Sequence, residues 1–153
     1  MCITTITRCP NVRQVVDWLR QWPHGPLPQP SKLLLWAEAL ESGRYKQGNG
    51  HLYLDGRHCC LGVLTEIADT PAEACEQAYL DDAVAAWLGL PGHQVSDPCI
   101  PMVRRMVQGA GLAEEVVVRV PFWELNDQLH WTFKEIAAAI RVYAEAIEAL
   151  ERD

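Results

Sequence analysis

Apolar side chains recur every three to four residues along most of this chain, which is the spacing of one face of an α-helix. The pattern predicts helices at residues 10–22, 31–42, 60–69, 71–79, 82–89, 101–108 and 132–151. The longest begins at Thr132-Phe133-Lys134-Glu135, where a threonine precedes a glutamate by three residues. Such a capping box satisfies backbone N–H groups that the start of a helix leaves unpaired.

Local signals also mark the ends of the first two helices. Asn11 and Ser31 precede them and are typical N-cap residues, whose side chains accept hydrogen bonds from the first helical turn. Gly43 follows the second helix at the position where a left-handed residue commonly ends a helix.

Two short runs around Asp55-Gly56 predict a β-hairpin. Residues 51–54 and 57–60 are separated by this dipeptide, which favours a two-residue type I′ turn. Tyr53 then lies opposite His58, and we expect His51 to join them in one cluster. Residues 116–120, rich in valine, are a possible further strand at the hairpin's edge. The fold class is therefore α+β: a predominantly helical single domain, 1–153, with a small antiparallel β-hairpin or sheet.

The composition is that of an ordinary globular protein and excludes few classes of function. The chain has 153 residues, enough for one domain with a real core, and its hydrophobic content is 49%. No apolar run approaches the ~18 residues that span a bilayer, and the first ten residues lack the pattern of a signal peptide. We therefore expect a cytoplasmic protein without membrane contact. The six cysteines form no CxxC pair or zinc-finger spacing, so we expect reduced buried thiols, no metal and no cofactor.

The distribution of charge is the strongest functional signal. The net charge of −7 argues against binding duplex DNA, which needs an extended basic face. Yet the stretch from Gly43 to His58 carries Arg44, Lys46 and Arg57 against a single carboxylate, Asp55. Basic side chains in a glycine-rich loop, whose backbone N–H groups can turn towards an anion, are typical of phosphate binding. A solvated turn between a helix and a hairpin is the alternative reading of this loop.

The candidate ligand-binding residues extend beyond these cations to the loop's polar, aromatic and glycine residues. The full set is Arg44, Tyr45, Lys46, Gln47, Gly48, Gly50, His51, Tyr53, Arg57, His58, Asn126 and Asp127. Asn126-Asp127 have two readings. In one, the pair meets the loop and orients Arg44 or Lys46, or contacts a ribose. In the other, Asn126 ends a short helix in the left-handed conformation and Asp127 caps the connection.

Three stretches resemble a set of small phage- and prophage-encoded proteins of uncharacterised activity. They are WAEALESGRYKQGNGHL (36–52), CCLGVL (59–64) and LNDQLHWTFKEIAAAI (125–140). The resemblance implies a phage source and the host cytoplasm, where small phage proteins bind or inactivate host factors, including the nucleotide signals of defence systems.

Together these observations predict a protein that sequesters a small anionic, nucleotide-derived ligand without catalysis. One alternative is a protein–protein inhibitor whose basic loop and exposed tryptophans dock on an acidic host protein. Another is a hydrolase that depends on cysteine or histidine, using Cys59 with His51 and Asp127. It is disfavoured because His58, adjacent to Cys59, would point to the opposite face of a strand. We also expect a homodimer that covers apolar surface near the hairpin edge and the valine-rich strand.

Overall fold

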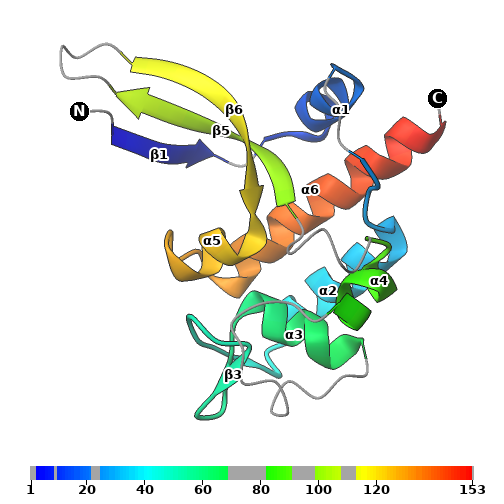
Figure 1. The fold of residues 1–153 in the computed structure, drawn as a ribbon, viewed down its shortest axis with the longest axis vertical. Coiled ribbons are helices and arrows are strands. Elements are labelled where there is room, and N and C mark those ends of the chain that lie inside the picture. The colour runs from blue at the N-terminus through cyan, green and yellow to red at the C-terminus, as the bar shows by residue number, and fades with distance from the viewer. Residues whose placement is uncertain are drawn as a thin grey trace.

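The computed structural model describes residues 3–8, 10–21, 25–68, 82–90, 99–107 and 113–152. It has the predicted α+β, mostly helical fold (Figure 1). Its helices are α1 (Val12–Gln21), α2 (Pro30–Glu41), α3 (Cys60–Ile67), α4 (Asp82–Leu88), α5 (Phe122–Asp127) and α6 (Phe133–Arg152). Its strands are β1 (Ile3–Arg8), β2 (Lys46–Gln47), β3 (Tyr53–Leu54), β4 (Arg57–His58), β5 (Cys99–Val107) and β6 (Ala113–Pro121). The helix predicted at 71–79 lies outside the described residues.

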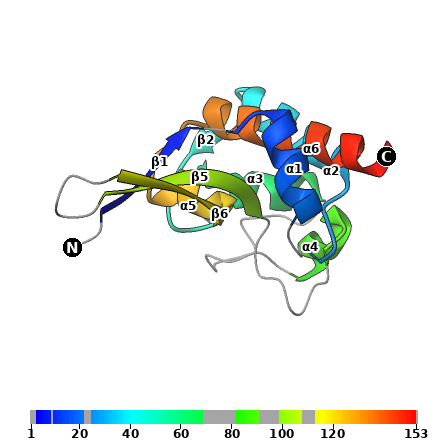
Figure 2. The ribbon, with the colours of Figure 1, turned by 90° about the horizontal axis from the view of Figure 1, so that it is seen from above.

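The core forms where α2 packs along α6, with α1 and α3 closing its sides (Figure 2). Trp36 of α2 is fully buried and meets Phe122 edge to face, with ring centroids 5.2 Å apart. The Trp36 indole N–H donates to the carbonyl of Cys60 at 2.9 Å, so the ring is both packed and hydrogen-bonded. This contact joins α2 to the start of α3.

Two of the predicted helix starts are confirmed, and one is wrong. Thr132 and Glu135 exchange the hydrogen bonds of a capping box, at 3.2 and 3.0 Å. The Asn11 side chain accepts from the N–H of Gln14 at 2.8 Å. Ser31, however, lies inside α2, because the helix already begins at Pro30. A proline is favoured at the first helical position, where its fixed φ suits the helix and its missing N–H costs nothing. At the other end of α2, residue 43 has a φ of 79°, as predicted for the glycine there.

The predicted hairpin is confirmed and belongs to a small three-stranded sheet of order β2-β4-β3. Tyr53 lies opposite His58, and Leu54 lies opposite Arg57. Asp55 and Gly56 both have positive φ, at 51° and 78°, which defines the type I′ turn. The sequence did not predict β2, which pairs parallel with β4.

The second sheet, of order β1-β5-β6, is antiparallel and overturns one helix prediction. Residues 101–108 were expected to be helical, but β5 runs as a strand from Cys99 to Val107. Ile100 and Met102, two residues apart, are both fully buried, as expected for one face of a strand. Pro101 is tolerated because the pairing with β1 reaches only Val103, so Pro101 has a paired strand on one side alone.

The strand expected at 116–120 is confirmed, but its predicted position is wrong. It forms part of the longer strand β6, which pairs with β5 rather than with the hairpin. In Figure 1 the β1-β5-β6 sheet and β3 lie towards opposite ends of the molecule. Among the described residues, no helix is both long enough and apolar enough to cross a membrane.

Candidate functional site

A buried amide, Asn126, holds the basic loop in place. Its side chain is fully buried, and its Oδ1 accepts from Gln47 Nε2 at 2.9 Å and from the N–H of Cys60 at 3.3 Å. Its Nδ2 donates to the carbonyl of Gly48 at 2.8 Å and to Asp127 Oδ1 at 2.7 Å. A primary amide offers two donors and two acceptor positions, so Asn126 is saturated by protein contacts.

Gln47 uses both of its side-chain donors in protein contacts and ties the loop to α6. Its Nε2 also donates to the carbonyl of Trp131 at 2.8 Å. Its Oε1 accepts at 3.1 Å from the N–H of Phe133, one of the unpaired amides at the start of α6. The side chains of Gln47 and Asn126 therefore position the loop, and neither has an N–H donor left for an anionic ligand.

The structure tests the structural parts of the two readings of Asn126-Asp127. The pair does meet the loop, but it holds backbone and Gln47 rather than Arg44 or Lys46. Asn126 lies within α5, so it is not a left-handed residue after the helix. The left-handed residue is His130, with a φ of 56°.

The adjacent cysteines fix the end of the hairpin to the core. Cys59 caps α3, its sulfur accepting from the N–H of Gly62 at 3.4 Å, and Cys60 Sγ donates to the carbonyl of Phe122 at 3.5 Å. Burial raises the pKa of Cys59 to about 11 and raises that of Cys60 as well. Both are therefore protonated thiols near neutral pH. Gly62 is needed for this packing, because a Cβ there would overlap the carbonyl oxygen of Leu52.

The inner face of the small sheet is aromatic. His58 packs edge-on between Tyr45 and Tyr53, with ring centroids 5.1 and 5.0 Å away. Its Nε2 lies 3.4 Å from Glu66 Oε1. The expected cluster therefore exists, but Tyr45 takes the place predicted for His51. By strand alternation, Tyr53 and His58 lie on the opposite face of the sheet from Lys46 and Arg57.

The outer face of the same sheet is cationic. Lys46 is the register partner of Arg57, and Arg57 is the partner of Leu54, so the three side chains form a row across the strands. All three are exposed. Within the part of the chain that the structure describes, neither cation forms an ion pair with a carboxylate. Like charges on neighbouring strands repel each other, although water and salt weaken the repulsion between exposed side chains, and an anion between the two cations would remove it.

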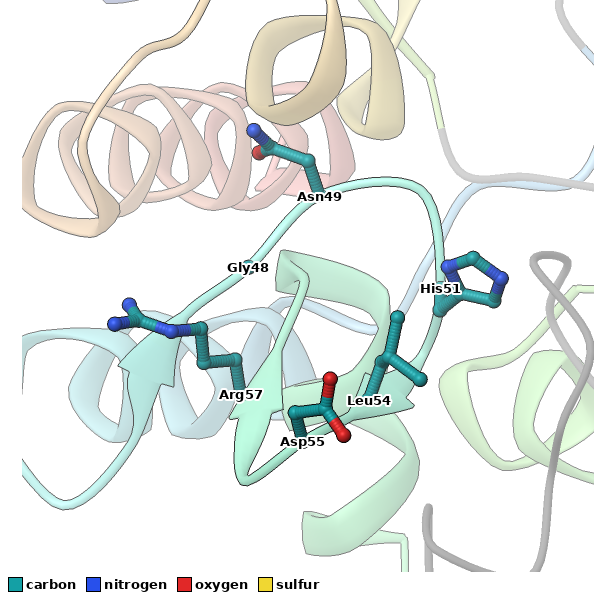
Figure 3. Close-up of a pocket in the computed structure, with 6 residues that line it drawn as sticks. All are labelled: Gly48, Asn49, His51, Leu54, Asp55 and Arg57. Carbon is teal, nitrogen blue, oxygen red and sulfur yellow. The ribbon is translucent and has the colours of Figure 1, made fainter.

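A shallow hollow of about 210 Å³ adjoins this row (Figure 3). It is lined by Gly48, Asn49, His51, Leu54, Asp55 and Arg57. The Arg57 guanidinium points away from Asp55, and its Nη1 donates to the carbonyl of Gln47 at 3.3 Å. Asn49, Leu54 and Asp55 were not among the predicted ligand residues. The alternation of the hairpin could have indicated Leu54, since it lies opposite Arg57.

The remaining predicted ligand residues lie elsewhere or are already paired. The N–H of Gly48 donates to the carbonyl of His58 at 2.7 Å, so it is not directed at an anion as expected. Gly50 is exposed, with a φ of 81°. Arg44 Nε donates to Ser42 Oγ at 3.2 Å and its guanidinium lies 5.8 Å from the Tyr45 ring centroid. Arg44 is thus not part of the hollow.

Comparison with known proteins gives a family but no activity. A family model described as a domain of unknown function (DUF8296) matches residues 32–144, a span from α2 into α6. No curated protein and no solved structure matches the chain.

Proposed function

We propose that this chain, which belongs to the DUF8296 family, binds a small anionic ligand on the outer face of its small sheet. The observation that carries the proposal is the juxtaposition of Lys46 and Arg57 on neighbouring strands, both exposed. An anion placed between them would replace a repulsion with two charge-assisted contacts. The wider role is sequestration of a nucleotide-derived signal in the cytoplasm of an infected host, as the resemblance to phage proteins implies.

The rigidity of the loop supports binding. Gln47 and Gly48, on either side of β2's end, are held by Asn126 and by β4, so the Lys46 backbone is fixed before a ligand arrives. A site that is already formed loses less conformational entropy on binding than a mobile loop does.

The dimensions of the hollow indicate which part of a nucleotide would be held. About 210 Å³ is below the ~300 Å³ at which pockets for drug-sized ligands begin. It suits the sugar next to a phosphate held between the two cations rather than a whole nucleotide, because Lys46 does not line the hollow and the acidic residue Asp55 does. Tyr53 and His58, expected to cover a base, face the other way, so a base would extend beyond the hollow near His51.

A protein partner is the second candidate, and Leu54 favours it. This leucine is 51% exposed and stands in the same row as the two cations. An apolar side chain beside positive charge suits an acidic protein surface with a hydrophobic contact at its centre. The chemistry shared by both candidates is recognition of negative charge by Lys46 and Arg57.

The cysteine-dependent hydrolase is the weakest candidate. The Cys59 sulfur is buried and accepts the N–H of Gly62, and its pKa of about 11 keeps it in the thiol form. Only the thiolate is an effective nucleophile. Cys59 therefore acts as the N-cap of α3 and is not activated as a nucleophile.

The experiment is a thermal melt in the presence of pyrophosphate, nucleoside mono-, di- and triphosphates, and cyclic dinucleotides. A ligand that binds only the folded chain adds ~2.7 kcal/mol at a hundred times its Kd, which shifts the Tm of a domain this size by roughly 5–10 °C. The proposal requires at least one anion to raise the Tm of the wild type, with less effect on Lys46→Gln. No shift with any anion, together with binding of an acidic peptide, would favour the protein partner.

A further inference from the structure

Strand β6 forms an edge of the larger sheet. It is last in the order β1-β5-β6, and no other strand among the described residues pairs with its outer side (Figure 1). It runs for nine residues, Ala113–Pro121. A long unpaired strand edge presents free N–H and C=O groups and is a template for pairing with another chain.

The side chains of β6 resemble those of a strand covered on both faces. Val116, Val117 and Val118 follow one another, and such continuous β-branched runs are typical of strands buried on both sides. Here all three are only partly buried. Val118 packs against the core on the same side as the fully buried Val120. By alternation, Glu115, Val117 and Arg119 share the opposite face, and both charged residues are exposed.

The sequence Glu115-Val-Val-Val-Arg119 is complementary to itself when read in the opposite direction. In an antiparallel pair about a two-fold axis, centring on Val117 places Val117 opposite its own copy and Glu115 opposite Arg119, twice. Centring on Val116 would place Glu115 opposite Val117, and centring on Val118 would place Arg119 opposite Val117. Opposite charges directly across an antiparallel pair are stabilising, so the first register is preferred.

We propose that β6 pairs antiparallel with β6 of a second copy of this chain, in the register that sets Glu115 against the partner's Arg119. The two sheets then form one continuous sheet, in which the β6 edge of each copy is paired. The small basic sheet lies towards the other end of the molecule, so the dimer leaves the hollow beside Arg57 open (Figure 1). The inference is therefore independent of the proposed ligand.

Charge exchange tests this register by light scattering across a concentration series. Glu115→Arg and Arg119→Glu each create like-charge pairs at both positions, and we expect each to raise the dimer dissociation constant at least ~10-fold. Mixing the two variants restores opposite charges between unlike copies, so an equimolar mixture should dimerise as the wild type does. Glu145→Arg, an exposed change on α6, is the matched control and should have no effect.

A second measurement covers any variant that fails to fold. Val117→Cys places two thiols at the two-fold axis, and mild oxidation should join the copies by a disulfide, whereas Glu145→Cys should not cross-link. A wild type of 17.2 kDa at every concentration would overturn the proposal. So would a dimer that resists both charge variants, or a Val117→Cys chain that cross-links no faster than Glu145→Cys.

Discussion

The side-chain amide of Gln47 donates to that of Asn126 at 2.9 Å, across 79 residues of chain. Through Asn126 the same network reaches Cys60, whose carbonyl accepts from Trp36. The three stretches 36–52, 59–64 and 125–140 are thus joined in space by hydrogen bonds between them. The network fixes a loop on which Lys46 and Arg57 are exposed.

Loss of the two donors of Asn126 should destabilise the fold. Asn126→Asp would set carboxylate oxygens against the carbonyl of Gly48 and the carboxylate of Asp127. We expect a loss of ~2–4 kcal/mol in the free energy of unfolding, measured with urea, because buried polar groups lose their partners. Gln128→Glu is the matched control, an exposed amide-to-acid change that should cost less than ~0.5 kcal/mol. A loss equal to the control would mean that the network does not hold the loop.

Gly62→Ala gives a prediction in which two effects have opposite signs. Helix propensity alone would make alanine more stable inside α3 by ~1 kcal/mol. The added Cβ, however, would overlap the carbonyl oxygen of Leu52, a backbone atom that cannot move aside as a flexible side chain would. We expect a net destabilisation of ~2 kcal/mol or more, measured by thermal or urea unfolding. A variant more stable than the wild type would contradict the close approach of α3 to Leu52.

Cys59 should make stability fall at high pH. Its pKa rises from 9.0 to about 11 in the folded chain, so between these values the unfolded chain has lost a proton that the folded chain keeps. The free energy of unfolding must therefore decrease as pH rises from about 9 to about 11, and Cys59 contributes no such loss below about pH 8.

The measurement compares wild type with Cys59→Ser by urea unfolding at about pH 7.5 and about pH 10.5. Serine can still cap α3 but does not titrate there, so the variant should lose ~2 kcal/mol less than the wild type between the two values. If the free energy of unfolding fell by the same amount between the two pH values in both proteins, the pKa of Cys59 would be the same in the folded and the unfolded chain.

Local signals predicted the parts of the fold that depend on neighbouring residues. The N-cap at Asn11, the capping box at Thr132 and the turn at Asp55-Gly56 all use contacts within four residues. Strand β5 was missed because its apolar residues are compatible with either period. One of its two partners, β6, begins only six residues after β5 ends, but the other, β1, is distant in sequence. In the pairing with β1, Ile3 lies opposite Val107. No pattern near residues 101–108 in the sequence predicts the pairing of β5 with β1.

In the site, too, features that depend on residues close in sequence could be predicted, and features that depend on long-range contacts could not. Clustered charge in the sequence identified Lys46 and Arg57, and the hairpin register places Leu54 beside them. The division between an aromatic inner face and a cationic outer face depends on β2, whose parallel pairing was not predicted. The use of all side-chain donors of Gln47 and Asn126 within the protein depends on a long-range contact between the two amides, which no local periodicity reveals.

The most direct test of the account is calorimetric titration of the anion that stabilises the wild type most in the thermal melts. Lys46→Gln and Arg57→Gln are compared with Arg13→Gln, which removes the same charge from an exposed position on α1. We predict that each of the first two weakens binding at least ~10-fold, because a hydrogen bond to a charged group contributes ~1.5–3 kcal/mol. The Tm of the ligand-free chains should stay nearly unchanged, since exposed charges contribute little to stability. Unchanged affinity in both variants, or an equal loss in Arg13→Gln, would contradict a site on the outer face of the small sheet.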